Sequence, residues 1–363
     1  MDEVKGSNPL CSTILQEAKV SMSEVDRLQN YYPFTTQTAE VVAEVAERFR
    51  ALNDWNELYS DFQADDSHAK LAEKTYTPAH GSPIKLVDIV PVEHDKTLMY
   101  HLPMGNSVDA NMQARLITLS AVLPNTRIIA AGNPAQPFTD SGKLNQYQRK
   151  EVSSGNFRST VDPILAYAHQ ERLERIDQVG FSYGADKALA AAILARCFDI
   201  TPDSVIPMDP ASVTPRTLFQ LGADFLATNK YLSEYVDAAE FPAYIDARKV
   251  AGRKTGWLAG YGLGLMRQSN IAIAKGIATG NFEDKLYQAL EHNPETDAAI
   301  VWGTESELAI DGTMRAVTGR IQTTFGQRVA SIPVTGQYHA MGDDVFLHAA
   351  LVREGLSQSP HLS

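Results

Sequence analysis

The segment from Gln178 to Ala188 contains the pattern Gly-x-Ser-x-Gly, between a run typical of a strand and a run typical of a helix. It reads Gln178, Val179, Gly180, Phe181, Ser182, Tyr183, Gly184, Ala185, Asp186, Lys187, Ala188. A glycine two positions before the serine and another two after it let the strand and the helix approach closely, while the serine occupies a strained turn. The same five residues also suit any tight turn that needs small side chains, so their meaning depends on the elements around them.

Strands and helices alternate on both sides of this segment. The predicted strands cover 84–92, 97–102, 126–131, a run that ends at residue 181, 204–208, 298–302 and 328–334, with helices at 108–122, 159–172 and 344–355. We expect the first two strands to form a hairpin. The rest of the alternation indicates parallel pairing through right-handed crossovers, with helices on both faces of the sheet. The predicted fold class is therefore α/β.

Two further parts of the chain read as helical and lie outside this alternation. Val41, Val45 and Phe49 recur at helical spacing, and a second helical stretch covers 10–28. The long interval between the fifth and sixth predicted strands also reads as helices. We therefore predict an α-helical N-terminal extension over residues 1–80, a core over 81–213 and 295–363, and an inserted helical cap over 214–294.

The formal net charge of −12 is concentrated near the N-terminus, because residues 1–75 hold 14 acidic side chains against 7 basic ones. An acidic chain repels nucleic-acid phosphates and anionic lipid surfaces, so we expect neither nucleic-acid binding nor membrane insertion. The one basic stretch, Arg248 to Lys254, suits the solvated face of a helix. The apolar stripe of the acidic extension suggests instead that the N-terminal helices bind a protein partner or a second copy of the chain.

The chain has two cysteines, Cys11 and Cys197, which are too few and too distant for a disulfide framework. This usage fits a reducing compartment. The sequence does not open on a basic region followed by an apolar one, and the longest apolar run, 188–195, is too short to cross a bilayer. We therefore expect a soluble cytoplasmic protein. No zinc-binding or nucleotide-binding motif is present in the sequence, so we expect no metal and no cofactor.

A serine hydroxyl becomes a good nucleophile when a base takes its proton, and a histidine commonly serves as that base. In this topology the histidine should follow the last strand. Among nine histidines, His339 is the one in a turn between the last predicted strand and the last helix. His348 lies within that helix, and His101 and His169 belong to other elements. We therefore expect Ser182 to act with His339.

Negative charge that forms on a substrate oxygen needs hydrogen-bond donors. Tyr183 N–H, at the start of the helix after the serine, is the first expected donor. The second should come from the loop after the strand at 97–102, where Pro103 has no N–H to donate. We expect Met104 N–H to be that donor, with Leu102 as the alternative, and an ordinary Pro-Gly turn would explain the same loop.

The acid that orients the histidine has two nearly equal candidates and a third. Asp209 directly follows the strand at 204–208, where a turn-forming or capping Asp would also be ordinary. Glu305 follows the strand at 298–302, which is the usual place for the acid, but its longer side chain costs more entropy to immobilise. Glu307, in the same loop, ranks third. The sequence leaves this choice open.

Together these motifs resemble the α/β-hydrolase fold superfamily, in its serine-nucleophile form with a helical cap, over residues 82–358. The order Ser182, acid, His339 is the order of that superfamily. The resemblance implies an eight-stranded, mostly parallel sheet and the hydrolysis of an ester, thioester, amide or related bond. Two positions depart from the family pattern: Leu102 replaces the glycine of its His-Gly-x-x-Gly loop, and Ser306 stands where Trp-Gly-x-x-Asp has its acid.

Two hypotheses about function follow. The first is a serine hydrolase that cleaves an ester, thioester or related acyl bond of a small molecule through an acyl-enzyme on Ser182, with His339 as base. The second is a non-catalytic scaffold of the same fold that serves as a binding or assembly protein. The altered positions 102 and 306 favour the scaffold, whereas the complete Gly-x-Ser-x-Gly segment and the well-placed histidine favour the hydrolase.

Overall fold

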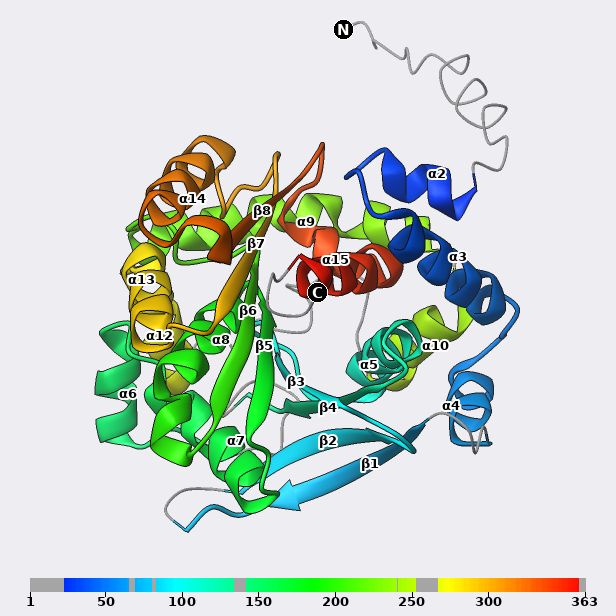
Figure 1. Cartoon of the computed structure of the whole chain (residues 1–363), viewed down its shortest axis with the longest axis horizontal. Coiled ribbons are helices and arrows are strands. Elements are labelled where there is room, and N and C mark those ends of the chain that lie inside the picture. The colour runs from blue at the N-terminus through cyan, green and yellow to red at the C-terminus, as the bar shows by residue number, and fades with distance from the viewer. Residues whose placement is uncertain are drawn as a thin grey trace, which may run out of the picture.

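The structure of the protein, a computed structural model, describes residues 23–64, 69–79, 83–133, 142–239, 241–252 and 267–358. These residues form one eight-stranded sheet with helices on both faces (Figure 1), which confirms the predicted α/β class. The strands are β1 Ala69–Tyr76, β2 Ile84–Pro91, β3 Lys96–His101, β4 Thr126–Ala131, β5 Arg175–Phe181, β6 Thr201–Met208, β7 Asp297–Gly303 and β8 Val329–Val334.

The sheet has the strand order β1-β2-β4-β3-β5-β6-β7-β8. Within it β2 is antiparallel to both of its neighbours, and every other neighbouring pair is parallel. The predicted hairpin between residues 84–92 and 97–102 is therefore wrong, because β4 lies between these two strands. The reason is topological: β3 and β4 are joined by a crossover helix, and all six residues of β4 are buried, so β4 takes the interior place beside β3.

The predicted helical extension is wrong at its end, because Ala69–Tyr76 form the edge strand β1 instead of helix. This strand pairs antiparallel with β2 along its whole length. Ala69 and Leu71 are buried, whereas Lys70 between them is exposed, which is the two-residue period of a strand with one covered face. Charged side chains are common on such edge strands because they discourage pairing with other chains, and here they hid the strand in the sequence.

The faces of the sheet are covered by different helices. Helices α5 (Ala110–Val122) and α15 (Val345–Ser357) lie on one face, and α7 (Arg158–Gln170), α8 (Tyr183–Leu194) and α14 (Asp311–Phe325) lie on the other (Figure 1). From β3 the chain moves to β4 and then returns across β3 to β5, so right-handed crossovers place α5 opposite α7 and α8. Open α/β sheets bind ligands at the carboxyl ends of their strands, at such a reversal.

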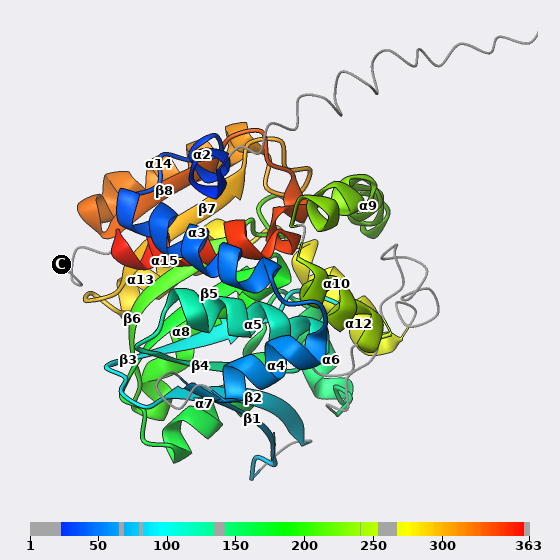
Figure 2. The ribbon, with the colours of Figure 1, turned by 90° about the vertical axis from the view of Figure 1, so that its right-hand side faces the viewer.

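The N-terminal helices form an outer layer over α5 and α15. They are α2 (Glu24–Gln29), the part of the helix predicted at 10–28 that lies within the described residues, α3 (Thr36–Arg50) and α4 (Trp55–Ala64). Helix α3 lies across α15 and α5 (Figure 2), and its Val45 and Phe49 join the same hydrophobic cluster as those two helices. The apolar stripe that suggested a partner surface is thus covered within the chain, and a partner bound through these helices stays a prediction.

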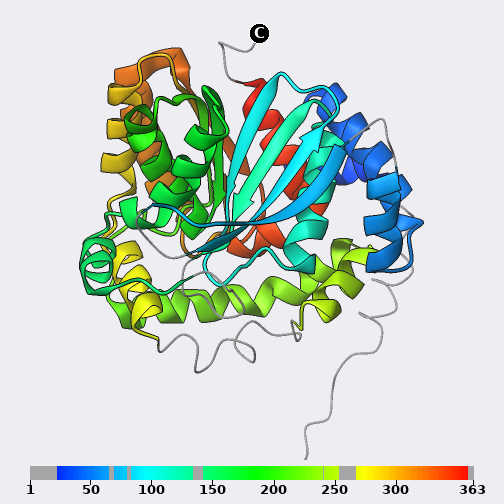
Figure 3. The same cartoon turned by 90° about the horizontal axis from the view of Figure 1, so that it is seen from below.

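The insertion between β6 and β7 contains α9 (Leu218–Ala239), α10 (Pro242–Val250), α12 (Gln268–Ile277) and α13 (Phe282–His292). Helices α9 and α10 run along one end of the layered core (Figure 3), with α9 against the turn at 339–343 and α10 against α5. Helix α12 packs on α6 (Gln146–Ser153). Helix α13 packs on α8, and its Phe282 shares a core cluster with Trp302 of β7. The last part of the predicted cap therefore contributes to the core.

Candidate active site

Ser182 lies in the sharp turn between β5 and α8. Its backbone angles, φ +58° and ψ −124°, belong to a region that residues other than glycine rarely adopt. A Cβ on Gly180 would lie 1.9 Å from the carbonyl oxygen of Gly184, and a Cβ on Gly184 would lie 2.0 Å from that of His101. Backbone atoms cannot approach a Cβ so closely. Glycine at both positions therefore allows β5, α8 and the loop after β3 to meet at the serine.

Ser182, His339 and Asp209 form one hydrogen-bonded line. His339 Nε2 lies 2.9 Å from Ser182 Oγ, and His339 Nδ1 contacts Asp209 Oδ2. The three residues follow β5, β8 and β6, whose carboxyl ends parallel pairing brings to the same edge of the sheet. All three residues are buried, and the ring of Phe181 stacks on the imidazole with 5.1 Å between the ring centroids. Packing as well as hydrogen bonding thus holds the imidazole in place.

The carboxylate of Asp209 is buried and has two further donors. Gly303 N–H donates to Oδ1 at 2.9 Å, and the hydroxyl of Ser306 donates to Oδ2 at 2.7 Å. The N–H of Asp209 itself donates to the carbonyl of Val301 at 2.7 Å, in a backbone conformation with φ +43°. A buried carboxylate needs such partners because it has lost its hydration. Together they fix the carboxylate against the imidazole.

The two glutamates considered for the same role are oriented differently. Glu305 is exposed, and its N–H donates to the carbonyl of Gln337 at 2.9 Å. Glu307 approaches the histidine at the backbone, where Oε2 lies 3.5 Å from His339 N. Among these three candidates, Asp209 is the one whose carboxylate contacts the imidazole. The sequence left the choice open because the ends of β6 and β7 converge, which a linear chain does not reveal.

The two N–H groups expected to face an oxyanion lie on adjoining segments. Tyr183 is the first residue of α8, and the first N–H groups of a helix have no partner within it. Met104 follows β3, in a loop that begins against the first turn of α8 at the close approach of His101 to Gly184. In the described part of the chain, no group accepts a hydrogen bond from Met104 N–H. Within the described residues, neither Tyr183 N–H nor Met104 N–H has an acceptor.

Two buried polar residues support this loop and were not found from the sequence. Asn133 follows β4, and its Nδ2 donates to the carbonyls of Pro103 at 2.8 Å and Leu102 at 3.3 Å. Lys187, one turn after Tyr183 on α8, donates to Asn133 Oδ1 at 2.6 Å. No motif marks Asn133. The signal for Lys187 was a lysine in a mostly apolar helix, since lysine is almost never fully buried without a partner.

His101 and His348 are buried in other contacts. His101 Nε2 lies 2.8 Å from Gln178 Oε1, and burial, together with the nearby charge of Lys187, lowers the pKa of His101 to about 3. His348 Nε2 lies 2.9 Å from Tyr100 Oη, and burial lowers the pKa of His348 as well. Both imidazoles are therefore neutral near pH 7. Their contacts are those of packed core residues.

Arg115 of α5 forms hydrogen bonds both to the turn that carries His339 and to the inserted helix α10. Arg115 of α5 donates to the carbonyl of Gly342, to Asp343 Oδ1 at 2.9 Å and to Tyr244 Oη of α10 at 3.0 Å. Arg115 is buried, so these bonds replace the water that its guanidinium would otherwise bind. The turn is thereby fixed from the side of the sheet that α5 covers.

An apolar cavity of about 450 Å³ opens beside the site. Its wall includes Met104 from the loop after β3, Leu221 and Phe225 of α9, and Ile271 and Ala274 of α12. The ring of Phe225 stands edge-on to the imidazole of His339, with 6.2 Å between the ring centroids. Met104, a candidate oxyanion donor, therefore lines the cavity, and the ring of Phe225 lies between the cavity and the candidate base. Its size is in the range of small-molecule binding sites.

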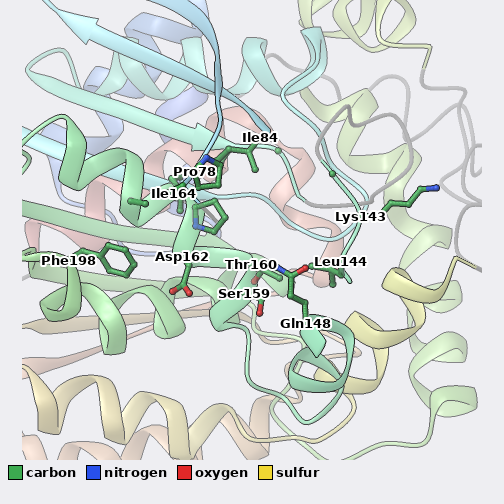
Figure 4. Close-up of a pocket in the computed structure, with 16 residues that line it drawn as sticks. Pro78, Ile84, Lys143, Leu144, Gln148, Ser159, Thr160, Asp162, Ile164 and Phe198 are labelled. Atoms are coloured by element: carbon green, nitrogen blue, oxygen red, sulfur yellow. The ribbon is translucent and has the colours of Figure 1, made fainter. Parts of the chain in front are cut away.

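A second cavity, of about 290 Å³, lies between the loop after β4 and helices α6 and α7 (Figure 4). Gln148, Ser159 and Asp162 give it a partly polar wall. Burial raises the pKa of Asp162, and its pairing with Arg158 opposes that change. The three hydrogen-bonded residues of the candidate site are not part of its wall. We therefore treat it as a separate feature.

The described residues contain no cluster of three or more His, Cys, Asp or Glu side chains arranged to hold a metal ion. None of the described helices combines the length and apolar character that a membrane-spanning segment requires. Cys197 lies within the described residues as an exposed, free thiol, whereas Cys11 lies outside them.

No protein-family model and no curated protein matches the sequence. Among solved structures, a thioesterase domain from the curacin biosynthetic pathway shares 16% identity over 78% of this chain and 98% of its own, with a TM-score of 0.49. An esterase of Pyrococcus furiosus shares 14% identity over 80% of this chain and 92% of its own, with a TM-score of 0.49. The 2-hydroxy-6-oxo-6-phenylhexa-2,4-dienoate hydrolase of a Rhodococcus strain shares 14% identity over 76% of this chain and 94% of its own, with a TM-score of 0.50.

The sheet order, the sharp turn between β5 and α8 and the likeness to the Rhodococcus structure define the class of protein: this chain has the α/β-hydrolase fold. The fold that the sequence resemblance implies is thereby confirmed. At 14% identity the likeness concerns the fold alone. Because one fold hosts many activities, the function has to be argued from the site.

Proposed function

We propose that the protein is a serine hydrolase that cleaves an ester, thioester or related acyl bond of a small molecule. The observation that carries this proposal is the hydrogen-bonded line from Asp209 through His339 to Ser182, with the serine at the sharp turn before α8. A nucleophile, a base and an orienting carboxylate in contact are the parts that acyl transfer to a serine requires.

In the proposed reaction, Ser182 Oγ attacks the substrate carbonyl carbon while His339 Nε2 accepts the hydroxyl proton. The tetrahedral intermediate presents its negative oxygen to the N–H groups of Tyr183 and Met104. When the C–O or C–S bond breaks, His339 gives the proton to the leaving alcohol or thiol. Water then attacks the acyl-enzyme, losing a proton to His339, and the carboxylic acid leaves as the proton returns to Ser182.

Asp209 has an orienting role in this proposal. Its contact with His339 Nδ1 favours the tautomer that carries a proton on that nitrogen, so Nε2 is free to accept the proton of Ser182. The donors Gly303 N–H and Ser306 hydroxyl keep the carboxylate from rotating away. When the imidazole becomes charged in the transition state, the fixed carboxylate stabilises it.

We further propose that the acyl part of the substrate is apolar. The cavity of about 450 Å³ adjoins Met104 and Phe225, so an acyl group attached at the serine has an apolar space beside it. Each methylene that leaves water contributes about 0.8 kcal/mol of binding free energy. A medium-length aliphatic ester should therefore be a better substrate than the corresponding acetate.

The non-catalytic scaffold is the alternative. The structure around Leu102 and Ser306 favours it less than the sequence alone does. Ser306 is bonded to Asp209, and Asp209 contacts His339, so the missing acid at position 306 does not leave the histidine without a carboxylate. Leu102 takes the place of a glycine, yet the Met104 N–H two residues later has no acceptor among the described residues. Both alterations are compatible with catalysis.

Covalent labelling tests the proposal. A fluorophosphonate probe should add once to the wild type, at Ser182, and not to Ser182→Ala, as read by mass spectrometry of the intact chain and its peptides. Ser159→Ala, which changes a partly buried serine of the second cavity, should be labelled like the wild type. Hydrolysis of p-nitrophenyl butyrate should show the same dependence. A wild type that is neither labelled nor active on p-nitrophenyl esters would refute the hydrolase and favour the scaffold.

A further inference from the structure

Lys187 and Asn133 connect the two elements that carry the proposed oxyanion donors. Lys187 Nζ donates to Asn133 Oδ1 at 2.6 Å, and Asn133 Nδ2 donates to Pro103 O at 2.8 Å, with longer bonds to the carbonyls of Leu102 at 3.3 Å and Asn106 at 3.4 Å. Asn133 is fully buried and Lys187 is 3% exposed. A buried chain of contacts thus runs from α8, through the segment after β4, to the loop after β3.

The bond to Pro103 sets the direction of the next N–H group. In a trans peptide, the carbonyl of one residue and the N–H of the next point in opposite directions, and the described peptides are all trans. Asn133 draws Pro103 O toward itself, so Met104 N–H points away from Asn133. Because Pro103 has no N–H, this is the first donor that the loop offers after Leu102. A donor of fixed direction and without a partner is what an oxyanion site requires.

Lys187 lies four residues after Tyr183, which places both on the same face of α8. Its Nζ is 5.8 Å from the centroid of the Tyr183 ring. Within the described residues, its ammonium has Asn133 as its hydrogen-bond partner, and burial lowers the pKa of Lys187 to about 7. Burial of an ammonium group with so little compensation is unfavourable. A methionine of similar length would avoid that cost, so stability alone does not explain a lysine here.

We propose that Lys187 and Asn133 are positioning residues that hold the loop after β3 against α8 and so set the distance and direction of the Met104 and Tyr183 N–H groups. This inference rests on the proposed function and adds the residues that arrange its oxyanion site. Neither side chain touches the substrate in this arrangement. Because negative charge on the substrate oxygen develops in the transition state, the contribution of both residues should appear in kcat and not in KM.

Three variants and one matched control test this proposal. Asn133→Ala removes both ends of the contact. Asn133→Asp keeps an acceptor for Lys187, and even adds a charge partner, but cannot donate to the loop carbonyls. Lys187→Met removes the ammonium and keeps the length of the side chain. The control is Lys285→Met, because Lys285 of α13 is another buried lysine. Its Nζ donates at 2.8 Å to Asp186 Oδ1, and Asp186 lies on α8 next to Lys187.

The measurements are kcat and KM for p-nitrophenyl butyrate and the midpoint of thermal unfolding. We expect kcat to fall by about tenfold to a hundredfold in all three test variants, with KM within about threefold of the wild type. Lys187→Met should unfold at or above the wild-type temperature. Lys285→Met should unfold at a lower temperature, since it leaves the buried carboxylate of Asp186 without its cation and with the hydroxyl of Ser212 as its remaining donor, and kcat should stay within about twofold.

Two results would overturn the inference in different ways. An active wild type with unchanged kcat in folded Asn133→Asp and Lys187→Met would show that the oxyanion site does not depend on these residues. A rise in KM at constant kcat would also contradict the inference, because it would place their effect on substrate binding. An inactive, unlabelled wild type would instead refute the proposed function, and this inference would fall with it.

Discussion

The hydroxyl of Ser306 donates a hydrogen bond of 2.7 Å to Asp209 Oδ2, the same oxygen that contacts His339. Ser306 follows β7 and Asp209 follows β6, and these two strands are parallel neighbours in the sheet. The residue at the usual acid position therefore supports a carboxylate supplied by the adjacent strand. The absence of an acid at position 306 therefore leaves His339 with a carboxylate from Asp209.

Asp209→Asn should lower kcat for p-nitrophenyl butyrate by about 10³-fold to 10⁴-fold, because the amide would hold the imidazole in the wrong tautomer. Glu305→Gln is the matched control, since Glu305 is exposed and lies in the loop after β7. It should leave kcat unchanged within about twofold. Steady-state kinetics decide between the two carboxylates, and the opposite ranking would make Glu305 the orienting acid.

Moving the acid tests the same geometry. Asp209→Gly accepts the positive φ at this position and vacates the space of the carboxylate. Adding Ser306→Asp should then restore kcat at least about tenfold over Asp209→Gly alone, because an aspartate at 306 stands on the neighbouring strand end. If the double variant is no faster than Asp209→Gly, a carboxylate at 306 cannot reach the imidazole.

Gly184→Ala should destabilise the fold, because the added Cβ would lie 2.0 Å from the carbonyl oxygen of His101. We expect the free energy of unfolding to fall by about 3 kcal/mol or more, as in overpacked cores. Gly319→Ala is the control on an exposed face of α14, where an added Cβ meets nothing within 4 Å. That change should raise the free energy of unfolding by up to about 1 kcal/mol. Urea unfolding followed by circular dichroism measures both.

The buried carboxyl of Asp177 should make the free energy of unfolding depend on pH. It is buried on β5, its Oδ1 accepts from Ser204 Oγ at 2.6 Å, and burial raises its pKa from 3.8 to about 6. Below pH 3.8 the carboxyl is protonated in both states and has no effect. From pH 3.8 to 6 the unfolded chain loses its proton first, so the folded state loses stability as the pH rises, and above pH 6 the loss is complete.

Asp177→Asn isolates this effect, because an amide oxygen can still accept from Ser204 but does not titrate. Its gain in the free energy of unfolding over the wild type should grow by roughly 2 kcal/mol between pH 4 and pH 6.5 and then stay nearly level. Urea titrations at pH 4, 5, 6 and 7.5 give the curve. A difference that is constant across this range would contradict the buried, titrating carboxyl.

Filling the apolar cavity should change the acyl preference. Ala274→Trp places a large ring in the wall that α12 contributes. The ratio of kcat/KM for p-nitrophenyl octanoate to that for p-nitrophenyl acetate should fall by about tenfold or more, since several methylenes lose their place out of water. The acetate serves as the internal control. Equal losses on both esters would indicate damage to the site and not a blocked acyl space.

The serine and the histidine of the candidate site could be chosen from the sequence because each is tied to a local pattern. Ser182 has a glycine two positions before it and another two positions after it, and His339 lies between the last strand and the last helix. Which carboxylate contacts His339 could not be predicted, since it depends on how two strand ends converge. The order of the first strands could not be predicted either: β4 enters between β2 and β3 through pairing that no local signal records.

The residues that support the proposed oxyanion loop could not be predicted from the sequence either. Asn133 and Lys187 are 54 positions apart, and their contact depends on how β4 and α8 pack around the loop after β3. A single asparagine after a strand is an ordinary turn residue. Long-range polar contacts of this kind leave no periodic pattern, whereas apolar spacing reveals helices such as α3 directly.

The N-terminal helices are fastened at both ends of the segment that carries His339. Thr335 N–H donates to Tyr31 O at 2.8 Å before the histidine, and Arg27 pairs with Asp344 after it. Translation produces the residues of α2 early and this segment late, with 317 positions between Arg27 and Asp344. The nascent chain therefore cannot complete the site until β8 and α15 have emerged, and the contacts with α2 can form only then.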